Sequence, residues 1–227
     1  MRLPERAAMR LSLAGVFVAL AAGVPHARGD TQAGFDACLG RLQPAAQKTG
    51  VQPDAFRRYT QDARFDATVL EKLDYQPEFR LPIWDYLAGL VDEERVADGL
   101  AMLAEHRAVL QKVAAAYGVD PATVVAVWGV ESNYGRITGK YPLVSALGTL
   151  SCFGRRQDYF RGEFFAALRI LQRGDIAPER LQGSWAGAFG HTQFMPGTYE
   201  RLAVDFDGDG RRDLVDNSAD ALASTAN

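Results

Sequence analysis

The chain has 227 residues, of which 48% are hydrophobic and 23% are charged, and its formal net charge is −3. These values are typical of a globular protein with enough apolar residues for one large domain, and they exclude a disordered chain. The acidic balance argues against a nucleic acid as the partner.

The first 27 residues have the pattern of a secretory signal peptide. Arg2, Arg6 and Arg10 come before an apolar stretch. That stretch, residues 11–23, is too short to cross a bilayer comfortably, and small residues lead from it to a cleavage site expected after Ala27. No cysteine follows it directly, which argues against a lipid anchor at this end. We therefore expect a periplasmic mature chain without a transmembrane segment, whose formal charge changes from −3 to −5 because three arginines and one glutamate leave.

Helix-forming stretches dominate the rest of the chain, so we expect a mainly α-helical domain over residues 28–227. Helical spacing or helix formers occur at residues 35–48, 53–62, 80–85, 93–117 and 159–172. His106 falls in the apolar stripe of the fourth stretch. Because no histidine or carboxylate stands four residues after it, we interpret it as a partly buried histidine and not as a ligand.

The two cysteines, Cys38 and Cys152, both lie in the expected mature chain. In a compartment that permits disulfides they can form one bridge, or they can remain two buried free thiols. Neither cysteine stands in a pattern that indicates a zinc site.

Glu131 ends an apolar run and is the main catalytic candidate. Asp120 as an N-cap and Pro121 in the first turn predict a helix that carries Glu131 in its last turn. Val127 and Trp128 then share the face of Glu131. Apolar neighbours raise the pKa of a carboxyl group, which favours a general acid. The alternative is a helix-end carboxylate that pairs with an arginine.

Residues 183–199 are rich in glycine, aromatic rings and side-chain amide or hydroxyl groups. Glycines allow a ligand to approach the backbone, aromatic rings cover the apolar faces of sugars, and Ser184 or Gln193 can bind hydroxyl and N-acetyl groups. The composition favours a sugar-binding segment. A glycine-rich loop packed for structural reasons is the alternative.

Residues 129–135 (Gly-Val-Glu-Ser-Asn-Tyr-Gly), 184–187 (Ser-Trp-Ala-Gly) and 193–196 (Gln-Phe-Met-Pro) together resemble the lytic murein transglycosylase B family. The similarity runs from about residue 35 to the last residue and includes residues 141–150 and 155–160. It implies a lysozyme-like fold and peptidoglycan glycan strands as the substrate. The implied reaction cleaves the β-1,4 bond between N-acetylmuramic acid and N-acetylglucosamine without water and leaves a 1,6-anhydromuramic end.

The residues fit a reaction of this kind. Hydrolytic glycosidases usually need two carboxylates, whereas no second acid follows Glu131 before Asp158. In the implied mechanism Glu131 acts first as the acid and then as the base. No organic cofactor is expected.

The resemblance also assigns residues to the substrate site. Ser184 and Gln193 match the positions that orient substrate, and Tyr86 matches an upstream active-site tyrosine, although it can equally be a tyrosine packed between helices. Arg155 and Arg156 can bind the anionic peptide or lactyl groups of peptidoglycan, or they can form a solvated or structural pair.

Residues 205–216 follow the spacing of an EF-hand calcium loop. The acids at loop positions 1, 3, 5, 9 and 12 are Asp205, Asp207, Asp209, Asp213 and Asp216. Gly210 occupies the sharp turn, and Arg211 would contribute its backbone carbonyl. We expect a structural calcium ion here, with weaker binding because an aspartate closes the loop in place of a glutamate. An acidic turn without an ion is the alternative.

Members of the resembled family continue past the position of Asn227 with a further active-site tyrosine and more helices. From the resemblance we expect a domain that is incomplete at the C-terminus, with exposed apolar surface and poor solubility. Two other functions therefore remain open besides transglycosylation. One is a hydrolytic muramidase, and the other is a catalytically dead module that binds peptidoglycan.

Overall fold

The computed structural model describes residues 31–74 and 81–227. The elements are α1 (Gln32–Lys48), α2 (Pro53–Thr60), α3 (Ala67–Glu71), η1 (Lys72–Asp74), α4 (Ile83–Leu90), α5 (Glu93–Glu105), α6 (Arg107–Tyr117), α7 (Pro121–Ser132), β1 (Tyr141–Pro142), α8 (Leu143–Phe153), α9 (Gln157–Arg173), η3 (Pro178–Arg180), β2 (Gln182–Gly183), α10 (Pro196–Leu202) and α11 (Ser218–Ala226). The predicted mainly α-helical class is confirmed. The predicted signal peptide lies outside the described residues.

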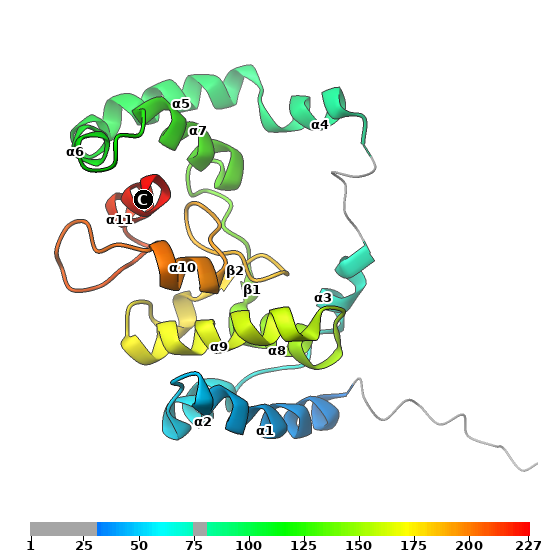
Figure 1. Cartoon of the computed structure of the whole chain (residues 1–227). Helices are drawn as coiled ribbons and strands as arrows, with labels where there is room; N and C mark the ends of the chain where they lie inside the picture. Colours follow the sequence, from blue (N-terminus) through cyan, green and yellow to red (C-terminus); the bar gives the residue numbers. More distant parts are fainter. Residues whose placement is uncertain (1–30, 75–80) are drawn as a thin grey trace, which may run out of the picture.

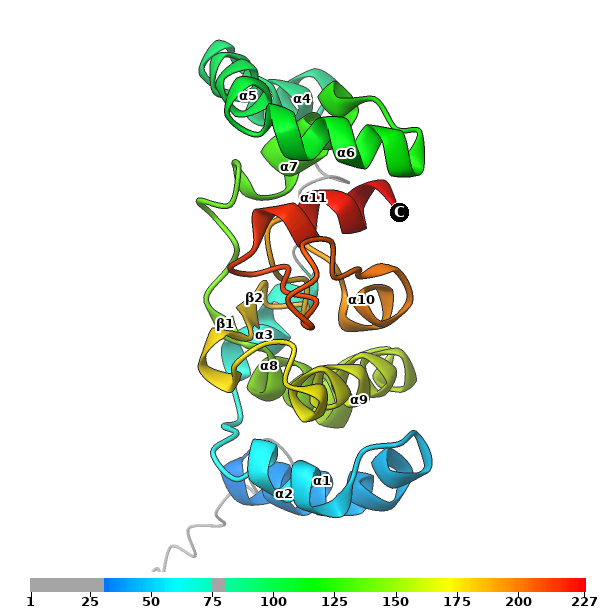
Figure 2. The same ribbon diagram turned by 90° about the vertical axis from the view of Figure 1, so that its left-hand side faces the viewer.

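The main core is built in layers around α8 and α9 (Figure 1). These helices pack along each other, with α1 and α2 on one side and α10 on the other (Figure 2). Phe164 and Leu168 of α9, one helical turn apart, are fully buried with Leu147 of α8. Residues 38 and 152 are joined by a disulfide that ties α1 to the end of α8. The structure therefore contains the disulfide and not the two free thiols.

A smaller second core lies between α6, α7 and α11. Leu110, Val124, Val125 and Trp128 meet Leu222 of α11 there. In Figure 1 these helices and α5 form a layer at the end of the molecule away from α1. The helix that bears Glu131 therefore rests on a separate core from the one beneath the glycine-rich segment.

The helical stretch predicted over residues 93–117 forms two helices, α5 and α6. The helix breaks at His106, which ends α5 and starts α6 with backbone angles outside the helical range. The break lets α6 turn toward α11, and the His106 ring lies edge-on to Trp128 with 5.2 Å between centroids. His106 is partly buried, as predicted.

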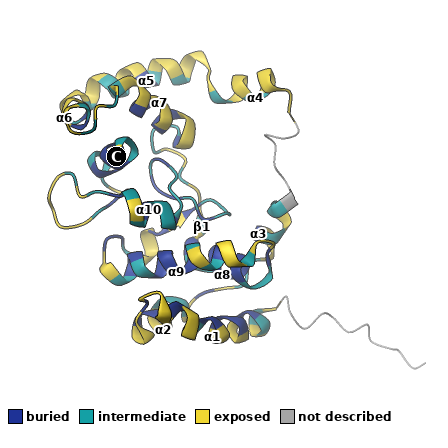
Figure 3. Ribbon diagram, in the orientation of Figure 1, coloured by how far each residue is buried: buried dark blue, intermediate teal, exposed yellow. Residues whose placement is uncertain are grey.

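The large apolar residues that are exposed concentrate on α4, on α5 and between them. Both helices consist mostly of exposed residues (Figure 3). Trp84, at 77% exposure, is the most exposed of the large apolar residues described. A groove between α5 and α7 is lined by Val96, Leu100, Val125 and Val130. Within the described part of the chain no single helix is long and apolar enough to span a membrane; α6 and α7 together have the length and composition, but they are bent by 112°.

Candidate active site

Helix α7 forms as its end signals predict and carries Glu131 in its last turn. The Asp120 carboxylate accepts a hydrogen bond from Ala122 N at 2.7 Å, and Pro121 occupies the first turn. Asn133 ends the helix in the left-handed conformation, with φ at 49°. The position of Glu131 is therefore fixed by local signals at both ends.

The carboxyl group of Glu131 reaches the surface, but the atoms around it remove enough water to raise its pKa. No arginine is recorded as a partner of Glu131 among the described residues. The nearby Arg136 instead pairs with Asp98, and Arg95 donates to the backbone carbonyl of Leu90. The carboxyl group has the features of a general acid, because its neutral form is favoured and it is free to meet a ligand.

Tyr134, two residues beyond α7, locks the end of that helix against α5. Its hydroxyl donates to the Arg95 carbonyl at 2.6 Å, and its ring packs on Trp128. The ring lies so close to Gly129 that a Cβ there would come within 2.6 Å of the hydroxyl oxygen. Any side chain at position 129 would displace the tyrosine and loosen the helix end below Glu131.

Ser132 connects the same helix end to the glycine-rich segment. Its side chain is 2% exposed, its Oγ donates to the His191 carbonyl at 2.5 Å, and it accepts a hydrogen bond from Gly135 N at 2.8 Å. The His191 ring packs on Trp128 with 5.4 Å between centroids, and burial lowers the pKa of this histidine. The two motifs that are far apart in the sequence are thereby brought together.

The glycine-rich segment folds as a set of tight turns. Ser184 Oγ accepts a hydrogen bond from Ala188 N at 3.0 Å, and Phe189 pairs with Phe194 through two backbone hydrogen bonds. Gln193 adopts a left-handed conformation, with φ at 52°. Many polar groups of this segment therefore form hydrogen bonds within the segment itself, as expected for a glycine-rich loop packed for structural reasons.

The amide of Gln193 has one side engaged. Its Nε2 donates to the carbonyls of Thr138 and Gly190, at 3.1 and 3.0 Å. Within the described chain no partner is recorded for its Oε1, which remains able to accept a hydrogen bond from a ligand.

A hollow of about 500 Å³ opens beside the segment. Its lining includes Arg155, Arg156, Tyr159, Trp185 and Met195. The Arg156 guanidinium stacks over the Tyr159 ring, 4.6 Å from its centroid, while Arg155 Nη2 donates to the Leu73 carbonyl at 2.9 Å. Both predicted arginines therefore reach one hollow that also offers aromatic surface.

Tyr86 is placed differently from the other predicted site residues. It lies on α4, which has no buried residue and which extends beyond the end of α5 in Figure 1. It is half-buried, and no described contact joins it to the hollow or to Glu131. Its predicted role as an active-site tyrosine therefore remains only a prediction.

The acid loop, residues 205–216, gathers three of the five predicted carboxylates. Oxygen atoms of Asp205, Asp207 and Asp209 all lie within 4.8 Å of one another. The Asp205 carboxylate accepts hydrogen bonds from three backbone amides of the loop, and Gly210 makes the turn with φ at 89°. Clustered oxygen ligands on a tight turn fit a hard cation such as calcium.

The other two predicted acids are hydrogen-bonded to other groups. Asp216 pairs with Arg180 through two hydrogen bonds, and these lower the pKa of Asp216. Asp213 Oδ1 accepts hydrogen bonds from the amides of Val215 and Asp216. Arg211 is oriented with its side chain toward Asp209, at 3.6 Å. The structure thus clusters three of the predicted ligands, and the roles of Arg211, Asp213 and Asp216 remain predictions.

A further carboxylate, outside the predicted motif, holds the loop in place. Asp220, in the first turn of α11, is fully buried and accepts hydrogen bonds from Phe206 N and Asp213 N, both at 2.8 Å. Its burial raises the pKa of its carboxyl group. The sequence gives no local signal for this role, because it depends on how α11 packs beside the loop.

The fold and the two motifs that it brings together are those of a known family of domains. The chain belongs to the transglycosylase SLT domain family, which matches residues 34–227. Among curated relatives it is 38% identical over 143 residues to membrane-bound lytic murein transglycosylase B of Escherichia coli (strain K12). That match covers 63% of this chain and 39% of the relative.

Solved structures give the same result. The chain is similar to SltB3 from Pseudomonas aeruginosa in complex with NAG-anhNAM-pentapeptide, with a TM-score of 0.81 and 44% identity over 85% of this chain and 52% of that one. It is also similar to the Escherichia coli lytic transglycosylase Slt35 in complex with calcium, with a TM-score of 0.73 and 32% identity over 85% and 61% of the two chains. The chain thus spans about half to three fifths of the solved relatives. The predicted family is confirmed.

Proposed function

We propose that this chain is the catalytic part of a lytic transglycosylase that cleaves the β-1,4 bond between N-acetylmuramic acid and N-acetylglucosamine. One observation carries the proposal. Glu131 has a raised pKa and no ion-pair partner in the described chain, while the residues around it hold it next to the glycine-rich segment. The resemblance to SltB3, which is solved in complex with NAG-anhNAM-pentapeptide, supports the same reaction, because that ligand carries an anhydromuramic group.

In the proposed mechanism Glu131 donates its proton to the glycosidic oxygen as the bond from that oxygen to C1 of the muramic acid breaks. The resulting carboxylate then takes the proton of the C6 hydroxyl while the C6 oxygen bonds to C1. No water is consumed, and the enzyme returns to its starting protonation state. A single carboxyl group suffices, in contrast to the pair that hydrolytic glycosidases use.

The glycine-rich segment and the hollow are the proposed substrate contacts. Gln193 Oε1 and the Ser184 hydroxyl would bind sugar hydroxyl or acetamido groups, and Trp185 would cover an apolar sugar face. Arg155 and Arg156 would attract the negatively charged peptide or lactyl groups. Substrate would therefore lie between Glu131 and the hollow.

The acid loop is proposed to bind calcium through Asp205, Asp207 and Asp209. The solved Slt35 complex with calcium supports this assignment. The ion would brace the chain that leads into α11, and it would take no part in bond cleavage. The expected signal peptide and the cell-wall substrate both favour a periplasmic location.

Mass spectrometry of fragments released from purified peptidoglycan tests the function. Residues 28–227 should release anhydro-muropeptides, and Glu131→Gln should reduce the release by about 100-fold or more, because a positioned general acid contributes that much. Glu93→Gln, at an exposed position on α5, is the matched control and should retain activity.

The other outcomes decide between the alternatives. Products with a free reducing end would identify a hydrolytic muramidase. Binding to peptidoglycan without any release, by this chain and by a longer one, would identify a binding module.

A further inference from the structure

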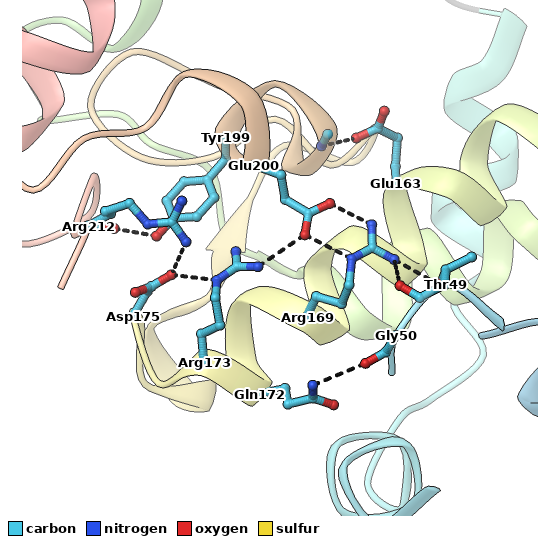
Figure 4. Close-up of polar contacts among 11 residues, drawn as sticks. Thr49, Gly50, Glu163, Arg169, Gln172, Arg173, Asp175, Tyr199, Glu200 and Arg212 are labelled. Atoms are coloured by element: carbon cyan, nitrogen blue, oxygen red, sulfur yellow. Dashed lines mark hydrogen bonds and ion pairs between the residues drawn. The ribbon is translucent and has the colours of Figure 1, made fainter. Parts of the chain in front are cut away.

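Helix α10 directly follows the Gln193 to Met195 stretch, and its N-terminus lacks a cap of its own. Met195 in the cap position offers no side-chain hydrogen bond, and Pro196 has no N–H. The first available amide, Gly197 N, instead donates to Glu163 Oε2 at 2.7 Å. Glu163 belongs to α9, so a neighbouring helix supplies the missing acceptor (Figure 4).

The fit between Glu163 and Gly197 is close. A Cβ at position 197 would lie 2.9 Å from Glu163 Oε1, so glycine leaves the space that the carboxylate fills. The backbone at Gly197 is not in the left-handed region, so the close contact with the Glu163 carboxylate, and not backbone conformation, is what favours a glycine here.

A second glutamate holds the other side of α10 and serves as a comparison. Glu200 accepts hydrogen bonds from Arg169 at 2.8 and 2.5 Å and from Arg173 at 3.1 Å (Figure 4). These contacts lie away from the hollow. Glu163, by contrast, accepts a hydrogen bond from the amide two residues after Met195. Met195 lines the hollow together with Arg156 and Tyr159.

We propose that Glu163 is a positioning residue for glycan binding: by capping α10 it fixes the Gln193 to Met195 stretch against the hollow. The inference rests on the proposed function for the role of that stretch. The charge-assisted hydrogen bond to Gly197 N sets where Met195 and the amide of Gln193 stand, while Glu200 only secures α10 to α9.

Binding of a GlcNAc–MurNAc tetrasaccharide, measured by calorimetry on residues 28–227 carrying Glu131→Gln, tests the inference. Adding Glu163→Ala should weaken binding about tenfold, because the Gln193 to Met195 stretch, released by the loss of roughly one charged hydrogen bond, must then be ordered when the glycan binds. Glu163→Gln should largely restore binding, because its amide oxygen can still accept from Gly197 N. Gly197→Ala should weaken binding without lowering the melting temperature, because alanine favours the helix but displaces the carboxylate.

Glu200→Gln is the matched control. It should lower the melting temperature and leave the affinity unchanged. Equal affinity of the Glu163→Ala and parent proteins would overturn the inference. It would also be overturned if the Glu163 and Glu200 variants lost affinity in the same proportion to their loss of melting temperature.

Methyl NMR separates this inference from the proposed function. Met102 and Met195 are the methionines of residues 28–227, so each gives an assignable signal. The Met195 methyl should shift in Glu163→Ala and the Met102 methyl should not. An unmoved Met195 signal overturns the positioning role, whereas a shifted signal in a protein that binds no glycan would count against the proposed function alone.

Discussion

Ser132 Oγ donates a hydrogen bond to the backbone carbonyl of His191, a residue 59 positions away. The contact joins the helix that carries Glu131 to the segment that carries Ser184 and Gln193. Because the two elements rest on different hydrophobic cores, this buried link sets the register between the proposed acid and the proposed sugar contacts.

Ser132→Ala should lower the free energy of unfolding by about 2 kcal/mol, since it removes two buried hydrogen bonds and leaves Gly135 N and the His191 carbonyl without their partner. It should also reduce fragment release, because Glu131 loses its alignment. Urea unfolding and the release assay measure both effects. Ser151→Ala is the matched control: Ser151 is equally buried but bonds only to Leu147 within its own helix. Equal losses in the two variants would contradict the linking role.

The raised pKa of Glu131 predicts how stability depends on pH. Between the unfolded pKa of about 4.3 and the higher folded pKa, the native state keeps a proton that the unfolded state has lost. Stability therefore falls as pH rises through this window. Glu131→Gln has no carboxyl group that titrates at this position. The melting temperature of the variant minus that of the wild type should therefore increase from about pH 4 upward and become constant above the folded pKa. Differential scanning calorimetry across this range would show a constant difference if the carboxyl group were not shifted.

Calcium should stabilise the chain through the acid loop. Calcium at about 100 times its dissociation constant should add about 2.7 kcal/mol to the free energy of unfolding. Asp207→Asn should weaken this gain, because its carboxylate belongs to the oxygen cluster. Asp216→Asn should retain it, because Asp216 is paired with Arg180. Thermal melts with calcium and with a chelator measure this stabilisation. If calcium failed to stabilise Asp216→Asn, Asp216 would be a calcium ligand, as the EF-hand spacing predicts.

The disulfide should contribute strongly to stability, because it links positions separated by 114 residues. Reduction should lower the free energy of unfolding by about 2 to 5 kcal/mol. Thermal melts with and without a reductant measure the loss. The double variant Cys38→Ala, Cys152→Ala should melt like the reduced protein and should not respond to reductant, whereas a reductant effect in that variant would point to a different cause.

The elements with local signals were predictable from sequence. Helix α7 starts at Pro121 and ends at Ser132 as its capping residues indicate, and Glu131 falls in the last turn. The break at His106 was not predictable, because it depends on packing against Trp128 and on α11, which comes much later in the chain. Local propensity alone favours a continuous helix there.

The candidate site, like the fold, could be predicted only in part. The residue types of the motifs indicated the chemistry, but their contacts depend on partners distant in sequence. Arg180 pairs with Asp216, and the start of α11 directs Asp220 toward the acid loop. Likewise, nothing local to Ser132 indicates the His191 carbonyl as its acceptor. The spacing of acids in a sequence can indicate a set of metal ligands, but it does not show which other groups will form hydrogen bonds with each carboxylate.

Helix α11 contributes Ala221 to the main core and Leu222 to the second core. The pair formed by α6 and α7 therefore lacks one wall of its core until α11 docks. Loosening α11 removes apolar contacts from both cores at once, so the two cores should unfold together in one cooperative transition.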